Sequence, residues 1–80
     1  MSSSAAETAI EQLLDERGVG KTICPSEAAK RLVLPHEDWR LKMDEIHSAV
    51  DAMVDAGSIT LSWKGQPVRQ RRGPYRIARR

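Results

Sequence analysis

Residues 58–80 constrain the fold of this chain most strongly, because they have the pattern of a β-hairpin. Apolar and polar residues alternate from Ser58 to Lys64, which predicts a half-buried strand. A loop rich in Gly, Pro and Arg (65–74) separates this run from a second short strand at 75–79. The sequence therefore predicts a long hairpin over these residues.

This hairpin carries charge of only one sign. It contains no acidic residue, whereas residues 1–57 contain all eleven Asp and Glu side chains and six basic ones. The formal net charge of +2 conceals this division. A segregated charge of this kind bears on the choice of partner rather than on the fold. The seven basic side chains of the hairpin are Lys64, Arg69, Arg71, Arg72, Arg76, Arg79 and Arg80.

A first amphipathic helix is predicted at residues 5–16. Ser4 and Glu7 have the spacing of a capping box, in which the Ser hydroxyl accepts a hydrogen bond from the Glu amide. Gly18 ends the helix, since glycine readily adopts the left-handed conformation found at helix ends. A short extended segment is expected at 22–24.

Two further helical segments are predicted before the hairpin. The second helix begins at Pro25, because proline suits the first helical position, and Pro35 ends it. The third helix runs from about residue 44 to 56 and stops at Gly57. The pattern leaves open whether 39–56 form one kinked helix or a turn followed by a helix.

This order of elements predicts an α+β fold. Three helices that pack on one face of a small three-stranded antiparallel sheet bury the apolar faces of all the elements. In this arrangement the short strand that contains Ile23 pairs with the edge of the hairpin. The side chains of Ile59, Leu61 and Ile77 point toward the helices. We therefore expect a winged helix-turn-helix whose wing is the basic β-hairpin 58–80.

The length of 80 residues indicates one domain, 1–80, in which residues 1–4 form a polar arm that frays. Cys24 is the only cysteine, so no disulfide can form within the chain and a reducing, cytoplasmic setting is expected. The apolar runs are too short to span a membrane, and we expect neither a signal peptide nor a membrane partner.

No pattern of catalytic, metal-binding or cofactor-binding residues is found. Gly20-Lys21-Thr22 resembles the end of a phosphate-binding loop, but Asp15 stands where that motif needs its first glycine, and a helix precedes it instead of a strand. Cys24 has no partner base and is expected to be a small buried residue. His36 and His47 have no clustered ligands and are expected at the surface or at helix caps. We expect a protein without enzymatic activity, metal or cofactor.

Several segments resemble a small bacterial family, the domain of unknown function 3253 family, whose members are winged-helix-like. The matching residues are Arg17-Gly18, Gly20 to Ala29, Trp39-Arg40, Met43, Gly57, Ile59, Lys64-Gly65, Gly73-Pro74 and Arg76-Ile77. The segment 20–27, Gly-Lys-Thr-Ile-Cys-Pro-Ser-Glu, is the most specific part. Asp44 departs from the family pattern, in which a proline often follows the methionine. The resemblance implies a fold but no activity.

Nucleic-acid binding is the first functional hypothesis. Lys and Arg side chains that meet phosphates supply most of the affinity for duplex DNA, so seven cations suffice for a salt-sensitive interaction. Arg69, Arg71 and Arg72 lie in the loop, where a wing contacts a groove or the phosphate backbone. The third helix is unsuited to base readout, since it holds four carboxylates and no Lys or Arg. We therefore expect the wing, rather than the third helix, to make the main contact with the nucleic acid.

Protein–protein interaction is the alternative. The basic wing can meet an acidic partner, or the acidic helix of a second copy, because opposite charges favour such an association. The arginines can also simply keep an edge strand soluble. Trp63 can stack on a base, but its expected role is to cover the sheet.

Overall fold

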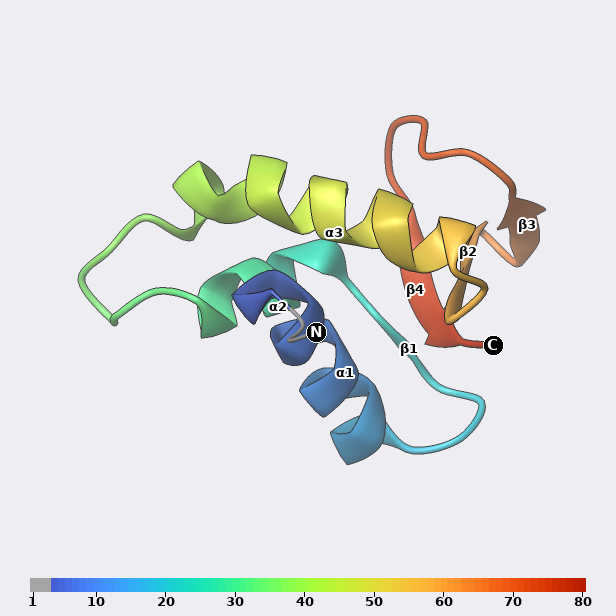
Figure 1. Ribbon diagram of the computed structural model, residues 1–80, viewed down its shortest axis with the longest axis horizontal. Helices are drawn as coiled ribbons and strands as arrows, with labels where there is room; N and C mark the ends of the chain where they lie inside the picture. Colours follow the sequence, from blue (N-terminus) through green and yellow to red (C-terminus); the bar gives the residue numbers. More distant parts are fainter. Residues whose placement is uncertain (1–3) are drawn as a thin grey trace.

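A computed structural model of the chain describes residues 4–80 (Figure 1). It is an α+β structure with three α-helices and a four-stranded antiparallel sheet. In chain order the elements are α1 (Ala5–Arg17), β1 (Thr22–Ile23), α2 (Pro25–Arg31), a 3-10 helix η1 (Trp39–Lys42), α3 (Met43–Asp55), β2 (Ile59–Trp63), β3 (Gln66–Val68) and β4 (Arg76–Arg79). No helix of residues 4–80 is long and apolar enough to cross a bilayer.

The predicted Ser4 cap of the first helix and the stop at Gly18 are confirmed. The amide of Glu7 donates a hydrogen bond to Ser4 Oγ at 3.1 Å, so Ser4 begins α1. Gly18 ends α1 with a φ of 92°, and its amide donates to the carbonyl of Leu14 at 3.0 Å. The remainder of the expected polar arm, residues 1–3, lies outside the described residues.

The second helix is shorter than predicted, because it ends at Arg31 and not at Pro35. The following residues form a turn of their own: the amide of Leu34 donates to Glu37 Oε1 at 2.7 Å, and the amide of Glu37 donates to the carbonyl of Leu34 at 2.9 Å. A residue before proline is also driven out of the helical conformation. Residues 39–55 then form a 3-10 turn that continues directly into α3, so this region is a turn plus a helix.

The sheet has four strands in the order β1-β4-β2-β3, so the expectation of three strands is wrong. The predicted central pairing is confirmed, since Ile77 lies opposite Ile23 on one side and Leu61 on the other. The additional strand β3 pairs with the outer edge of β2, where Trp63 faces Gln66 and Leu61 faces Val68.

The extra strand arises from the two-residue turn Lys64-Gly65. Both residues have positive φ, 52° and 79°, which is the backbone twist that folds a strand directly back on its neighbour. Residues 66–68, expected in a loop, therefore form an edge strand. Pro67 is tolerated there because an edge position does not require its missing amide.

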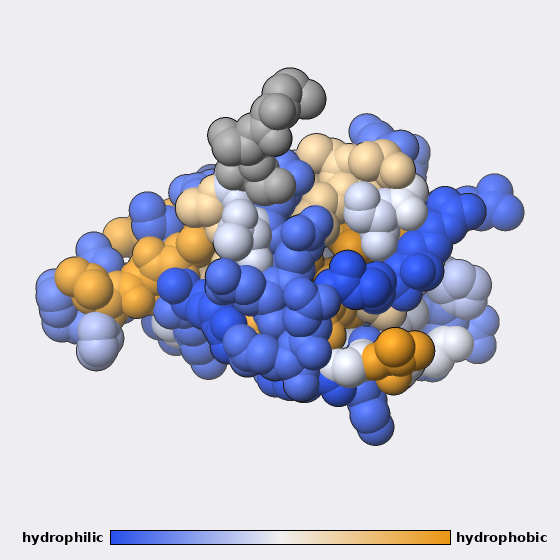
Figure 2. All heavy atoms as spheres, turned by 60° about the horizontal axis from the view of Figure 1, so that its bottom comes forward, coloured by the Kyte–Doolittle hydropathy of each residue, from blue (hydrophilic) through white to orange (hydrophobic). Residues whose placement is uncertain are grey.

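The helices cover one face of the sheet. Ile59, Leu61 and Ile77 are buried on this face, as predicted, together with Ile23. Ile10, Ile46 and Val50 are fully buried residues on the facing helices. Figure 2 shows mainly hydrophilic atoms on one side of the molecule, with hydrophobic atoms gathered at the end formed by the connector between α2 and η1.

Candidate functional site

The seven basic residues of the hairpin do not form a single cluster. The register places Arg79 opposite Ile59 and Arg76 opposite Ser62. Arg79 and Arg80 therefore lie at the end of the sheet away from the turn at 64–65. The other basic residues lie in or beside residues 64–75, which we call the wing loop; it includes the edge strand β3.

Arg71 of the wing loop is bound to the acidic helix α3. Its Nε and one Nη donate to the two carboxylate oxygens of Asp51 at 3.1 and 3.0 Å. The hydrogen bonds from Arg71 hold the pKa of Asp51 below its usual range, and those to Asp51 raise the pKa of Arg71. The pair is at the surface, so it contributes about 0–1 kcal/mol. It fixes the wing loop on α3 and neutralises one of the four carboxylates of that helix.

Arg76 and Arg79 also have partners within the chain. Arg76 donates to Thr22 Oγ1 at 2.7 Å and to the carbonyl of Thr22 at 3.3 Å, which joins β4 to β1. Arg79 reaches from β4 to α1, where it pairs with Asp15 at 2.6 Å and donates to the carbonyl of Glu11 at 3.3 Å. Both arginines thus contribute to the packing of the sheet.

The other four basic residues are exposed: Lys64, Arg69, Arg72 and Arg80. None of them forms an ion pair with another residue of 4–80. Lys64, Arg69 and Arg72 belong to the wing loop, and we call them the free wing cations. They are the part of the predicted site that is available to an anionic partner.

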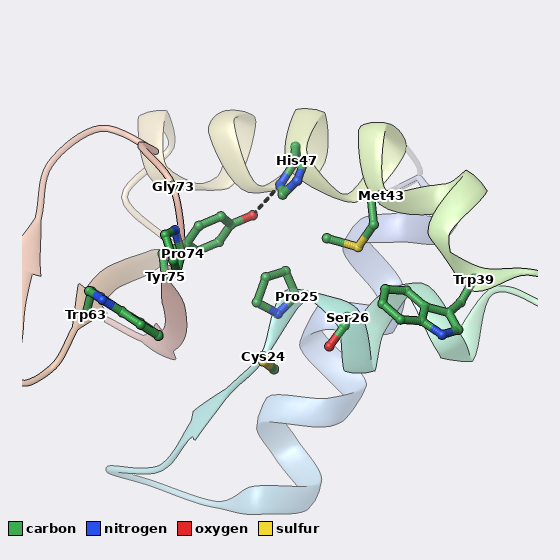
Figure 3. A pocket seen from close by; sticks show the side chains of 10 residues that line it. All are labelled: Cys24, Pro25, Ser26, Trp39, Met43, His47, Trp63, Gly73, Pro74 and Tyr75. Carbon is green, nitrogen blue, oxygen red and sulfur yellow. Dashed lines mark hydrogen bonds between the residues drawn. The ribbon is translucent and has the colours of Figure 1, made fainter.

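An apolar groove opens beside the wing loop (Figure 3). Trp63 and Tyr75 lie at one end, Trp39 lies at the other, and Pro25 and Met43 lie between them. The groove has a volume of about 280 Å³. Gly73 and Pro74 also line it, so the wing loop forms one wall.

Tyr75 and His47 meet at the edge of this groove. Tyr75 Oη lies 2.7 Å from His47 Nδ1, and the ring centroids are 5.7 Å apart. Burial raises the pKa of Tyr75 to about 12, so the phenol keeps its proton and donates it to the imidazole. Burial and the nearby Arg71 lower the pKa of His47, which favours the neutral ring that accepts this bond. His47 is therefore half-buried and bonded, which corrects the expectation of a surface or capping histidine.

Two contacts thus fasten the wing loop to α3. His47 and Asp51 are one helical turn apart, and they bind Tyr75 and Arg71 respectively. Since the wing loop carries the free wing cations, these contacts determine where those cations stand relative to the groove.

The specific segment 20–27 contributes to the start of α2. The amide of Cys24 donates to Glu27 Oε2 at 2.9 Å, and Arg17 binds Oε1 of the same carboxylate at 2.6 Å. Burial alone would raise the pKa of Glu27, but the hydrogen bonds from Arg17 and Cys24 outweigh it and lower the pKa.

The Cys24 side chain is half-buried at the groove, less buried than expected. No three His, Cys, Asp or Glu side chains of residues 4–80 are grouped as a metal site.

Trp39 of the groove is close to two cations. Lys30 Nζ lies 5.1 Å and Arg40 Cζ 4.9 Å from the centroid of the Trp39 ring, which is the distance of a cation–π contact. Trp63 immediately precedes Lys64. The alternation along β2 already indicated that Trp63 lies on the same face as Leu61, but it gave no sign that a groove ends there.

Comparison with known protein families identifies one match. The model of a family described as a protein of unknown function (DUF3253) matches residues 3–80. The chain therefore belongs to this family, and the resemblance found in the sequence is confirmed. No curated protein matches the chain significantly.

Proposed function

We propose that this member of a family without an assigned activity is a non-enzymatic winged-helix domain that binds nucleic acid through its wing loop. The order of the central strands supports the fold assignment. β1, which lies between the first two helices in sequence, pairs with β4, and β4 pairs with β2. The chain between β2 and β4 is then the wing, with β3 folded against its outer edge.

The free wing cations are the observation that carries this proposal. Several arginines of this molecule have acidic partners within the chain, as in the pairs of Arg31 with Glu16 at 2.5 Å and Arg17 with Glu27 at 2.6 Å. Lys64, Arg69 and Arg72 have none within residues 4–80. Exposed cations gathered on one loop are the usual means of binding phosphates.

The charge of α3 supports contact through the wing rather than through this helix. Asp44, Asp51 and Asp55 lie on its exposed side at a spacing of one to two turns. Arg71 neutralises Asp51 only. A duplex inserted against α3 would bring its phosphates close to the remaining carboxylates, and this repulsion disfavours the usual insertion of a recognition helix.

A binding experiment with matched variants tests the proposal. We expect the wild-type protein to bind a labelled oligonucleotide at low salt, as measured by fluorescence anisotropy. The double variant Arg69→Ala/Arg72→Ala should weaken this binding about tenfold or more, since each lost phosphate contact lowers affinity. The control Lys21→Ala/Lys42→Ala removes the same charge outside the wing loop and should change it much less.

Two results would refute the proposal. Absence of binding to any oligonucleotide at low salt would exclude a nucleic-acid partner. Equal weakening in the wing variant and the control would show that only the net charge matters.

Protein–protein interaction is the second candidate, because the wing loop is basic and α3 is acidic. In that case the protein should form dimers that dissociate as the salt concentration rises.

A further inference from the structure

We propose that the apolar groove binds the bases of unpaired nucleotides, so that the ligand of the wing loop is a single strand. This inference rests on the proposed function and specifies its substrate class. DNA and RNA share the chemistry in question, which is a planar base joined to an anionic phosphate.

The aromatic side chains of the groove are suited to stacking. Trp63 is 39% exposed at the end of β2, although large apolar side chains of the same strand face are almost fully buried. Figure 3 shows its indole at one end of the groove and that of Trp39 at the other. Trp39 is half-buried, so Trp63 offers the exposed ring, and such a ring provides a stacking surface that accepts any base, because every base has a π-face.

Cations that contact a groove-lining residue, or are next to one in the sequence, complement a phosphate backbone. Lys64 follows Trp63 directly, and Arg72 precedes the groove-lining residues Gly73 and Pro74. At the other end Lys30 and Arg40 lie against Trp39. A ligand that fits this arrangement has flat apolar faces and repeated negative charges beside them. Single-stranded nucleic acid has both properties.

The shape and charge of the surroundings favour a single strand over a duplex. The volume of about 280 Å³ is close to the lower end of the range of about 300–1,000 Å³ of small-molecule sites, so the groove has room for an individual base. Met43 and His47 of α3 line it, while Asp44 of the same helix is exposed. A duplex would bring a second phosphate chain to this acidic helix. A single strand can direct its bases into the groove and its phosphates toward the free wing cations.

Competition between strand types tests the inference. The probes are a labelled single-stranded DNA of about 12 nucleotides, which is within the range of about 4–16 nucleotides bound by single-strand domains, an RNA of the same sequence, and the corresponding DNA duplex. At equal salt, at least one single strand should bind tighter than the duplex and quench the tryptophan fluorescence. The comparison of DNA with RNA identifies which of the two is preferred.

The Trp63→Ala variant tests the role of stacking. It should weaken single-strand binding about 5- to 150-fold, which corresponds to about 1–3 kcal/mol of stacking, and should leave the dependence on salt unchanged. Trp63→Phe keeps an aromatic face and should retain most of the affinity, which separates stacking from a structural role. Leu41→Ala, a change at an apolar side chain that is 81% exposed and does not line the groove, is the control.

The failure of this inference differs from the failure of the proposed function. Duplex binding equal to or tighter than that of both single strands, with no effect of Trp63→Ala, would overturn the inference while the wing loop remains a nucleic-acid contact. Absence of binding to all three probes would overturn both. In that case, quenching of the tryptophans by an acidic peptide would identify a protein partner.

Discussion

The hydrogen bond between Tyr75 and His47 is a specific test of how the wing loop is held on α3. Tyr75 is 3% exposed, so Tyr75→Phe keeps the buried ring and removes only the hydroxyl. The change removes Tyr75 Oη, which lies 2.7 Å from His47 Nδ1. The half-buried imidazole then has no hydrogen-bond donor at this nitrogen. Loss of one such bond lowers the free energy of unfolding by about 1 kcal/mol. For a domain of this size, we expect the melting temperature to fall by about 4–8 °C.

Thermal unfolding followed by circular dichroism measures this fall, and a double-mutant cycle assigns it to the pair. His47→Ala, Tyr75→Phe and the combined variant should show a coupling of about 0.5–1 kcal/mol, because residues in direct contact do not act additively. Additive effects, or an unchanged melting temperature in Tyr75→Phe, would refute the claim that this bond holds the wing loop.

Three other predictions concern stability and the charge of the wing loop. Gly57→Ala should lower the free energy of unfolding in urea by about 1 kcal/mol, because the φ of 76° is strained for a residue with a Cβ; the loss should persist in an Arg80→Ala background. His47 has a lowered pKa in the folded state, so its contribution to stability is complete above the unfolded pKa of 6.5 and is lost as pH falls through the folded pKa. His47→Gln should therefore reduce the pH dependence of the melting temperature below pH 6.5, and an identical profile would contradict the shift. Asp51→Asn should release Arg71 and so tighten oligonucleotide binding at low salt. The slope of log K against log salt should become steeper by about 0.7–0.9, and an unchanged slope would show that Arg71 does not reach the phosphates.

The parts of the fold that depend on local signals were predictable from the sequence. Ser4, Pro25 and Gly57 begin or end helices because of their own backbone and side-chain chemistry, so neighbouring residues suffice to identify them. The inward face of the hairpin was also predictable, since the side chains of a strand alternate between faces. This alternation correctly assigned Leu61 and Ile77 to the core.

The fourth strand was not predictable in the same way. Lys64 adopts a positive φ, which is uncommon for a residue other than glycine, so the residue type did not indicate the tight turn. Pro67 argued against a strand, because proline is absent from most strand positions. The short α2 likewise depends on a turn between Leu34 and Glu37 that competes with the helix.

The candidate site was predictable in composition but not in detail. The sequence identified the basic residues, but only the tertiary structure separates Arg71, which binds Asp51, from Arg69 and Arg72, which have no acidic partner within residues 4–80. The groove combines Trp39 and Trp63 from distant segments, and no local pattern indicated that they share a cavity.

The salt dependence of binding to single-stranded DNA tests the central claim most directly. Each phosphate contact made by Lys64, Arg69 or Arg72 should release about 0.7 counterions from the single strand on binding. The triple alanine variant should therefore have a slope of log K against log salt that is shallower by about 2. The control Lys21→Ala/Lys42→Ala should keep the wild-type slope. A triple variant that binds with the same slope as the wild type would contradict contact through the wing loop.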